Sequence, residues 1–293
     1  MRAAEAMGDF GPTVTSSQNR WVKLARSLQR RKARYTERAF LVEGVRLLTD
    51  ALDAGAVPSV LFIDAEKEHS ALTELATAAH ARGARVIPVT SALLRSIADT
   101  ETPQGVVGIV PFPELGERGD IGAGATAPLF LIADGIRDPG NLGTLLRAAL
   151  GAGAHGVYVT AGTTDPFAPK VVRAGMGAHF RLPIAYLDWR APAPHIAGIA
   201  TRIAATGDAE TVYDAIDWTA PACVIIGSEA EGLSPAAREF ATGTARIPLA
   251  GGLESLNAAM AGTVILFEAA RQRRARELRG EGETISVHTR HKA

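Results

Sequence analysis

The chain is patterned as short apolar runs that alternate with segments of helical periodicity, and the alternation occurs in two series. The first series runs from AFLVEG to GVVGIVPF, and the second starts at PLFLIADG and ends in a long helical segment. Apolar runs that alternate with helices are typical of α/β domains, in which helices cover both faces of a mostly parallel sheet. The pattern therefore predicts an α/β fold with mostly parallel, covered sheets.

A stretch rich in glycine and proline separates the two series. PELGERGDIGAGATAP has little apolar content and no periodicity, which is typical of an interdomain linker. With 293 residues, 47% of them hydrophobic, the chain is long enough for two domains with sizeable cores. We expect a loose lead-in over 1–16, an N-terminal α/β domain over 17–112, a linker over 113–127, a larger C-terminal domain over 128–277 and a polar tail over 278–293.

The first helical segment of the N-terminal domain, expected over 17–34, is strongly basic. Trp21, Leu24 and Leu28 recur at helical spacing. From residue 20 to residue 38 there are eight basic residues and one acid, a local charge of +7 in a chain with 31 basic and 31 acidic residues. Because basic helices are often only solvated faces, the residues alone leave a solvated surface and an RNA-binding surface both open.

Cysteine content and hydropathy narrow the class of protein further. The single cysteine, Cys223, excludes a disulfide scaffold and a cysteine-rich metal site, and its apolar neighbours favour a buried thiol. No run of about 18 apolar residues occurs, and the N-terminus lacks the apolar core of a signal peptide. We expect a cytoplasmic protein that spans no membrane and binds no metal.

One glycine string imitates a dinucleotide-binding motif. GAGAHG, which starts at Gly151, matches G-x-G-x-x-G, a motif that must follow a strand and open a helix. Here the string follows the helical segment NLGTLLRAAL and precedes the strand GVYVT, so its glycines are expected to end the helix and turn the chain. This order disfavours both an NAD-dependent enzyme and a Rossmann methyltransferase.

Three stretches of the C-terminal domain place polar residues after strands or at helix starts, where α/β sheets bind ligands. DGIRDPGNLGTLLRAA holds Asn141 and Arg147, and an arginine among apolar residues predicts an anion nearby. VIIGSEAEGLS holds Glu229, and RIPLAGGLESLNAAMAG holds Ser255 and Asn257. Taken singly, the glutamate is more simply explained by an exposed loop, and the last two residues by helix capping.

In this order, NLGTLLR, IGSEAEGLS and IPLAGGLESLNAAMAG resemble the three motifs of the SpoU (TrmH-type) RNA 2′-O-ribose methyltransferases of the SPOUT superfamily. The N-terminal region is similar to the substrate-binding domain that many members carry, in the stretches SLQRRKARYTERAFLVEGVRLLTDAL and TPQGVVGIV. The resemblance therefore covers nearly the whole chain after about Thr15. It implies a C-terminal SPOUT domain with a parallel sheet and a deep trefoil knot. It also implies a smaller N-terminal α/β domain that binds RNA, S-adenosylmethionine as cofactor, and a homodimer joined through the C-terminal domain.

The activity implied by the resemblance is methyl transfer from S-adenosylmethionine to a ribose 2′-hydroxyl. Ribosomal RNA is the expected substrate, because the added N-terminal domain is more typical of members that act on ribosomal RNA. Two alternatives stay open: a catalytically silent RNA-binding or ribosome-assembly protein on the same fold, and a transfer RNA ribose methyltransferase.

The resemblance also implies roles for three sets of residues. Catalytic or positioning roles fall to Arg147, Asn141, Glu229, Ser255 and Asn257, and the guanidinium suits ribose-phosphate binding better than proton transfer. The cofactor is expected against Gly227, Ile247, Leu249, Leu256 and Ala258. RNA is expected against the basic residues Arg20, Lys23, Arg30, Arg31, Lys32 and Arg34.

Overall fold

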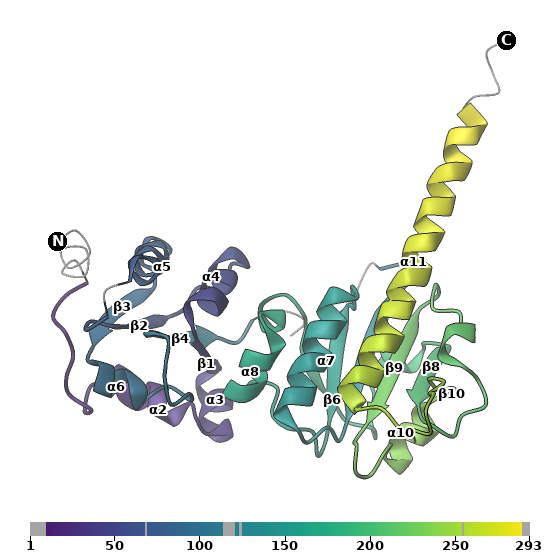
Figure 1. Cartoon of the computed structure of the whole chain (residues 1–293), viewed down its shortest axis with the longest axis horizontal. Helices are drawn as coiled ribbons and strands as arrows, with labels where there is room; N and C mark the ends of the chain where they lie inside the picture. Colours follow the sequence, from purple (N-terminus) through teal and green to yellow (C-terminus); the bar gives the residue numbers. More distant parts are fainter. Residues whose placement is uncertain (1–9, 68, 114–120, 123–124, 254, 289–293) are drawn as a thin grey trace. The chain divides into compact units, whose positions relative to one another are not determined.

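The computed structural model describes residues 10–67, 69–113, 121–122, 125–253 and 255–288, and the chain divides into two compact units (Figure 1). Unit 1 comprises Met1–Glu114 together with Asp165–Arg181, and unit 2 comprises Leu115–Thr164 together with Leu182–Ala293. A short segment from the expected C-terminal domain therefore clusters with the N-terminal unit. The chain passes from one unit to the other three times.

Unit 1 is built on a mixed sheet with the strand order β1-β4-β2-β3. β4 runs antiparallel to both β1 and β2, whereas β2 and β3 are parallel. The expectation of a mostly parallel sheet is wrong here, because an apolar run carries no information about strand direction. Val14, from the expected lead-in, forms a parallel bridge with Val89 at the sheet edge. The strands are β1 (Ala39–Glu43), β2 (Val60–Asp64), β3 (Arg85–Val89) and β4 (Val106–Pro111).

The basic segment of unit 1 forms two helices where the sequence predicts one. The side chain of Asn19 caps the first helix by accepting a hydrogen bond from the Trp21 N–H (2.9 Å). The chain then becomes extended at Arg30, which precedes the second helix. The helices of unit 1 are α2 (Arg20–Ser27), α3 (Arg31–Glu37), α4 (Val45–Asp53), α5 (Ser70–Ala81), α6 (Ser91–Arg95) and α8 (Pro169–Gly175), with the 3-10 turn η1 (Ala178–Phe180).

Buried charge and stacked rings hold the segment Asp165–Arg181 within unit 1. The Nε of Arg34 donates to Asp165 Oδ2 (2.9 Å), and the Tyr35 hydroxyl donates to Asp165 Oδ1 (2.9 Å). Phe167 stacks on Phe112 with ring centroids 4.1 Å apart. Residues far apart in the sequence thus share one core.

Unit 2 contains a parallel sheet with the order β10-β8-β9-β5-β6-β7, which confirms the predicted parallel α/β domain. Its central strands β5 and β9 are almost wholly buried, as expected for a parallel sheet covered on both faces. The edge strand ends at Ala245, and residues 247–250 after it form a loop. The strands are β5 (Leu129–Asp134), β6 (Gly156–Thr160), β7 (Ile184–Leu187), β8 (Thr201–Ala205), β9 (Ala222–Gly227) and β10 (Gly243–Ala245).

The helices α7 (Pro139–Gly151) and α11 (Ala258–His288) of unit 2 pack side by side (Figure 1). They approach so closely that a Cβ added at Gly262 would lie 2.4 Å from the Leu145 side chain. The last helix continues to His288, so the predicted polar tail begins as helix, and residues 289–293 lie outside the described part. The helices are α7 (Pro139–Gly151), α9 (Pro194–Ala197), α10 (Pro235–Phe240) and α11 (Ala258–His288), with the 3-10 turn η2 (Tyr213–Ala215).

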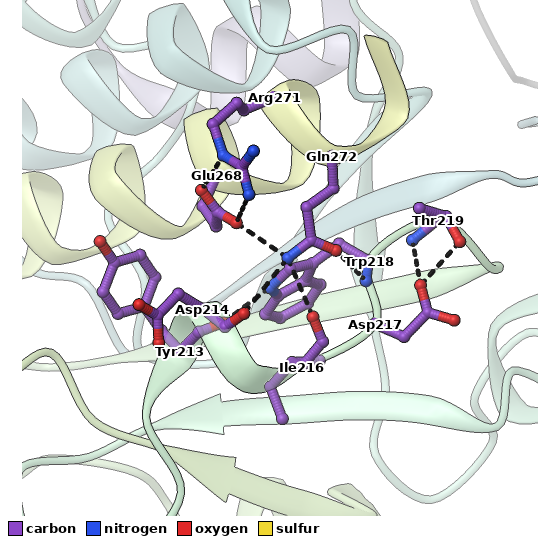
Figure 2. A network of polar contacts seen from close by, with 9 residues as sticks. All are labelled: Tyr213, Asp214, Ile216, Asp217, Trp218, Thr219, Glu268, Arg271 and Gln272. Atoms are coloured by element: carbon purple, nitrogen blue, oxygen red, sulfur yellow. Dashed lines mark hydrogen bonds and ion pairs between the residues drawn. The ribbon is translucent and has the colours of Figure 1, made fainter. Parts of the chain in front are cut away.

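A polar network fastens α11 to the connection between β8 and β9, as Figure 2 shows. Gln272 Nε2 donates to the Ile216 carbonyl (3.0 Å) and to Glu268 (2.8 Å), while its Oε1 accepts from the N–H of Trp218 (3.0 Å). The Nε of Arg273 adds a hydrogen bond to the Trp218 carbonyl (2.8 Å). Trp218 is fully buried. These contacts tie the middle of α11 to the rest of unit 2. Within the described ranges, no helix combines the length and apolar character that a membrane span requires.

Candidate active site

Side chains from all three motifs meet at the carboxyl end of the unit 2 sheet. Asn141 Nδ2 donates to Glu229 Oε1, and Asn257 Nδ2 donates both to Asn141 Oδ1 (2.9 Å) and to Glu229 Oε1 (2.7 Å). Asn257 is also a helix cap, because its Oδ1 accepts from the N–H of Ala259 (2.9 Å) at the start of α11. The sequence left capping and function as alternatives for Asn257; in the structure it caps the helix and also contacts the polar residues of the other two motifs.

The first residue of this cluster is positioned by an ordinary helix start. The Asp138 side chain accepts from the Asn141 N–H (2.8 Å), and Pro139 occupies the first position of α7. Asn141 therefore lies in the first turn of α7 with its amide free to reach Glu229. The three clustered side chains are half-buried or exposed, so the cluster is open to solvent.

A cavity of about 670 Å³ lies beside the cluster. Its walls come from β9, from the loop that follows β9, from the loop after β10 and from the start of α11. All five residues expected at the cofactor line it, namely Gly227, Ile247, Leu249, Leu256 and Ala258. Glu229, Ser255 and Asn257 also line it, whereas Asn141 and Arg147 do not.

The loop after β9 is closed on itself. Ser228 and Gly232 exchange two backbone hydrogen bonds of 2.9 and 2.8 Å, which leave Glu229 at the loop tip. At the base of the loop, a Cβ added at Gly227 would lie 2.6 Å from the carbonyl group of Gly232. Only glycine permits this close approach of two backbone segments, so the sequence IGSEAEG is suited to this tight loop.

Arg147 lies apart from the cluster. Its side chain is exposed on α7, while Leu145, Leu146 and Ala148 around it are buried. Among the described residues it has no hydrogen bond or ion pair. Since the helix turns this side chain to solvent, the described residues do not supply the anion that the sequence predicts beside it.

The six basic residues expected to contact RNA separate into two groups. Arg20, Lys23, Arg30, Arg31 and Lys32 are exposed on or beside α2 and α3. Arg34 is only 3% exposed, and its guanidinium binds Asp165 and the carbonyl of Leu28 (2.7 Å). Because this guanidinium is inaccessible, the prediction that Arg34 contacts RNA is wrong.

Sequence reasoning missed several residues around the cavity. Thr206 and Gly207 follow β8 and line the cavity, as do Arg238 of α10 and Arg246 after β10. Ligands bind beyond the carboxyl ends of parallel strands, which is why the loop after the strand ACVIIG was a candidate. The same argument, applied to the strand that ends at Ala205, would have identified Thr206 and Gly207. No local pattern identified the two arginines.

Two other sequence predictions are confirmed. Cys223 is fully buried in β9, and burial raises the pKa of its thiol to about 12. In the glycine string GAGAHG, Gly151 is the last residue of α7, and Gly153 has a positive φ of 75°. The string therefore ends a helix and turns the chain, as its sequence context predicts.

Among the described residues, no group of three histidine, cysteine or acidic side chains is arranged to hold a metal ion.

Comparisons with known proteins point to a single family. Residues 128–267 match the model of the SpoU rRNA Methylase family, and residues 19–108 match the MRM3-like substrate binding domain. The chain is 36% identical over 301 residues to the mitochondrial rRNA methyltransferase 3 of Homo sapiens, covering 84% of this chain and 69% of that protein.

Solved structures agree with the sequence comparisons. The AdoMet-bound rRNA methyltransferase from Sinorhizobium meliloti is 35% identical with a TM-score of 0.76, covering 89% of this chain and 97% of that one. The SpoU methyltransferase AviRb from Streptomyces viridochromogenes, in complex with the cofactor AdoMet, is 31% identical with a TM-score of 0.75, covering 87% and 98%. The chain belongs to the SpoU rRNA methylase family.

Proposed function

We propose that this chain is an RNA methyltransferase that uses S-adenosylmethionine (AdoMet) to methylate a ribose 2′-hydroxyl in ribosomal RNA. The observation that carries the proposal is the meeting of Asn141, Glu229 and Asn257, one from each motif, beside a single cavity. The relative from Homo sapiens is named as an rRNA methyltransferase, and two solved relatives contain AdoMet.

The residues around the cavity fit AdoMet. The cavity volume of about 670 Å³ lies in the range of cofactor sites, and Ile226, Leu233 and Leu249 offer apolar walls for an adenine. Glu229 adds a carboxylate, which complements the positive charge of a sulfonium group. Gly227, which has no side chain, lets the backbone of Gly232 and Leu233 approach closely at the cavity wall.

When bound, AdoMet supplies an electrophilic methyl group. The amides of Asn141 and Asn257 both donate to Glu229 Oε1, so they fix the orientation of this carboxylate. Within the described part of the chain, Oε2 of Glu229 accepts no hydrogen bond, and it is the atom we assign to receive the proton of the 2′-hydroxyl. Ser255, on the cavity wall, is assigned to orient the ribose.

Arg147 is assigned to bind the RNA phosphate beside the reacting ribose. This exposed guanidinium binds no other described residue of the chain, so its donors can form a bidentate bond to phosphate oxygens. Its positive charge would also stabilise negative charge that develops on the 2′-oxygen. It is not assigned as a base, because an arginine stays protonated at neutral pH.

The exposed cations of α2 and α3 are proposed to bind the RNA substrate. Four of them, Arg20, Lys23, Arg31 and Lys32, lie in these two short consecutive helices, and Arg30 lies directly before α3. The guanidinium of Arg20 lies over the Trp21 ring, 4.4 Å from the ring centroid, so a cation and an aromatic surface lie together. Phosphate contacts of this kind dominate RNA affinity and make it depend on salt.

Homodimerisation through unit 2 is part of the proposal. Met260 and Phe267 are 58% and 44% exposed and stand two turns apart on α11, so they share one face of the helix. A second copy of the chain would bury this apolar face. The family resemblance further implies that the loops after β9 and β10 belong to a trefoil knot, and a cytoplasmic location remains a prediction.

The test uses the purified full chain. Calorimetric titration is expected to detect binding of AdoMet and none of NAD. Labelled methyl transfer to ribosomal RNA, followed by mapping of 2′-O-methyl positions, is expected to find a modified ribose. Binding of AdoMet without transfer to any ribosomal or transfer RNA would favour a silent RNA-binding protein, and transfer to transfer RNA alone would correct the substrate.

Two variants test the assigned residues in the same assay. Arg147→Ala is expected to lose most of the methyl transfer while AdoMet still binds, since this side chain does not line the cavity. Near-normal turnover at saturating RNA would show that its assignment is wrong. Glu229→Gln is expected to slow transfer because the amide is a poor proton acceptor, and an unchanged rate would move that role elsewhere.

A further inference from the structure

Asp134 is a buried carboxylate without a cationic partner among the described residues. It ends β5 and is 3% exposed. Three neutral groups donate to it: the Thr160 hydroxyl to Oδ1 (2.8 Å), the Trp189 Nε1–H to Oδ1 (3.2 Å) and the Ser234 N–H to Oδ2 (2.7 Å). Burying a carboxylate costs free energy that these hydrogen bonds offset. The arrangement therefore requires an explanation beyond packing.

The donors connect Asp134 to the loop that carries Glu229. Ser234 directly follows Gly232 and Leu233, which line the cavity. Ser234 also caps α10, where its Oγ accepts from the Ala237 N–H (3.1 Å). The hydrogen bond to Asp134 thus fixes the point at which the loop ends and α10 begins.

Asp134 also controls the other end of the same loop. Its backbone pairs with Gly227 in the parallel register of β5 and β9. Gly227 is the last residue of β9 and the base of the loop, whose ends are joined by the backbone hydrogen bonds between Ser228 and Gly232. Asp134 therefore contacts both ends of this closed loop. Its main chain pairs with Gly227, where the loop begins, and its side chain accepts from Ser234, where the loop ends.

We propose that Asp134 is a positioning residue for methyl transfer, whose carboxylate sets the placement of the 228–234 loop over the cavity. Through that loop it places Glu229 toward the Asn141 and Asn257 amides and holds Gly232 and Leu233 against the cofactor. The inference rests on the proposed function and deepens it by naming the element that shapes the site.

Asp134→Asn tests the carboxylate with little change of volume. Its single amide oxygen replaces two acceptors, so either Ser234 or the Thr160–Trp189 pair faces an N–H donor. Losing a hydrogen bond to a charged group corresponds to an affinity loss on the order of tenfold to hundredfold. We expect AdoMet affinity, measured by calorimetry on the full chain, to fall by at least about tenfold.

A matched pair at Ser234 isolates the proposed hydrogen bond even if Asp134→Asn fails to fold. Ser234→Ala removes the helix cap and keeps the N–H, whereas Ser234→Pro removes both. Proline is compatible with the backbone because Ser234 has a φ of −64°. We expect Ser234→Pro to bind AdoMet about tenfold more weakly than Ser234→Ala.

Hydrogen exchange without cofactor gives a second readout. The amides of residues 228–234 are expected to exchange faster in Asp134→Asn than in the wild type, while those of 213–219 keep their rates. Equal AdoMet affinity of the wild type and Asp134→Asn, or of the two Ser234 variants, would overturn the proposal. So would unchanged exchange in the loop. If the wild type itself bound no AdoMet, the proposed function would fail, and the exchange experiment would still decide whether Asp134 holds the loop.

Discussion

Two buried carboxylates, one in each unit, are stabilised in different ways. Asp165 in unit 1 binds the guanidinium of Arg34, so a negative charge is paired with a positive one. In the part of the chain that the structure describes, Asp134 of unit 2 accepts hydrogen bonds from neutral donors alone. The ion pair joins residues that are 131 positions apart in the sequence. Loss of either partner leaves an unpaired charge buried in the core. Three neutral donors share the second carboxylate, so the removal of one is expected to have a graded effect.

The largest effect is expected from Arg34→Ala, which leaves Asp165 buried without its cation. Removing one partner of a buried pair typically costs about 3–5 kcal/mol of unfolding free energy. Hydrogen exchange of amides in β1 and β4 should report this loss in unit 1, because those strands belong to it.

Lys32→Ala is the matched control for Arg34→Ala, because Lys32 is exposed on the same helix. It should leave exchange in β1 and β4 unchanged and should weaken RNA binding with a shallower dependence on salt. The opposite pattern, with Arg34→Ala affecting only RNA affinity, would restore Arg34 to the RNA surface.

The next largest effect is a pH dependence that arises at His179, close to Asp165. Its Nε2 lies 2.7 Å from the Pro166 carbonyl, which only accepts, so Nε2 carries the proton. Within the described structure, the buried Nδ1 has no partner. Burial lowers the pKa of His179 from 6.5 to about 4, although the Pro166 carbonyl and Asp165 oppose the shift.

Because the folded-state pKa of His179 is depressed, the unfolded chain takes up a proton first as the pH falls. The contribution of His179 is fully present above about pH 6.5 and is lost as the pH falls toward about 4. The expected loss is about 3 kcal/mol of unfolding free energy. Denaturant titrations at several pH values should show it, and His179→Gln should flatten the same window. An equal slope in both proteins would contradict this assignment.

A smaller effect is expected when one donor to Asp134 is removed. Thr160→Val keeps the shape of a side chain that is 1% exposed and deletes the hydroxyl that donates to Asp134. The expected cost is about 1–3 kcal/mol of unfolding free energy, because two donors remain. A loss as large as that of Arg34→Ala would show that neutral donors and an ion pair act alike here.

The smallest effect is expected at an exposed ion pair. Arg271 binds Glu268 on α11 but is 61% exposed (Figure 2), so Arg271→Ala should leave the unfolding curve unchanged within error. Gln272→Ala, one position along, should lower stability measurably because it breaks hydrogen bonds to Ile216 and Trp218. Similar losses for both variants would mean that surface charge contributes more than this comparison assumes.

Much of the architecture was predictable from local patterns. The strand and helix alternation identified the parallel sheet of unit 2, and the position of GAGAHG after a helix disfavoured a dinucleotide site. The direction of β4 was not predictable, because strand direction depends on which neighbours a strand meets. The break between α2 and α3 was missed because no glycine or proline in this segment marks it.

The candidate site was predictable to a similar extent. The three motifs supplied Asn141, Glu229 and Asn257, which the structure brings into hydrogen-bonding contact. Arg34 was misjudged, because its basic flanks suggested an exposed side chain, and the apolar flanks of Arg147 gave no sign that the helix turns its side chain to solvent. Flanking composition does not report which way a helix turns a single side chain.

The sequence by itself determined the family, the two-part organisation and the residues available for chemistry, because these depend on motifs and on periodicities that local geometry imposes. Only the tertiary structure decided which charges are buried and what neutralises them. Asp134 ends the apolar run LFLIAD and Asp165 lies in TTDPFAP, and neither context shows which partner the carboxylate meets. One meets three neutral donors and the other a guanidinium, because their partners come from distant parts of the chain that only folding brings together.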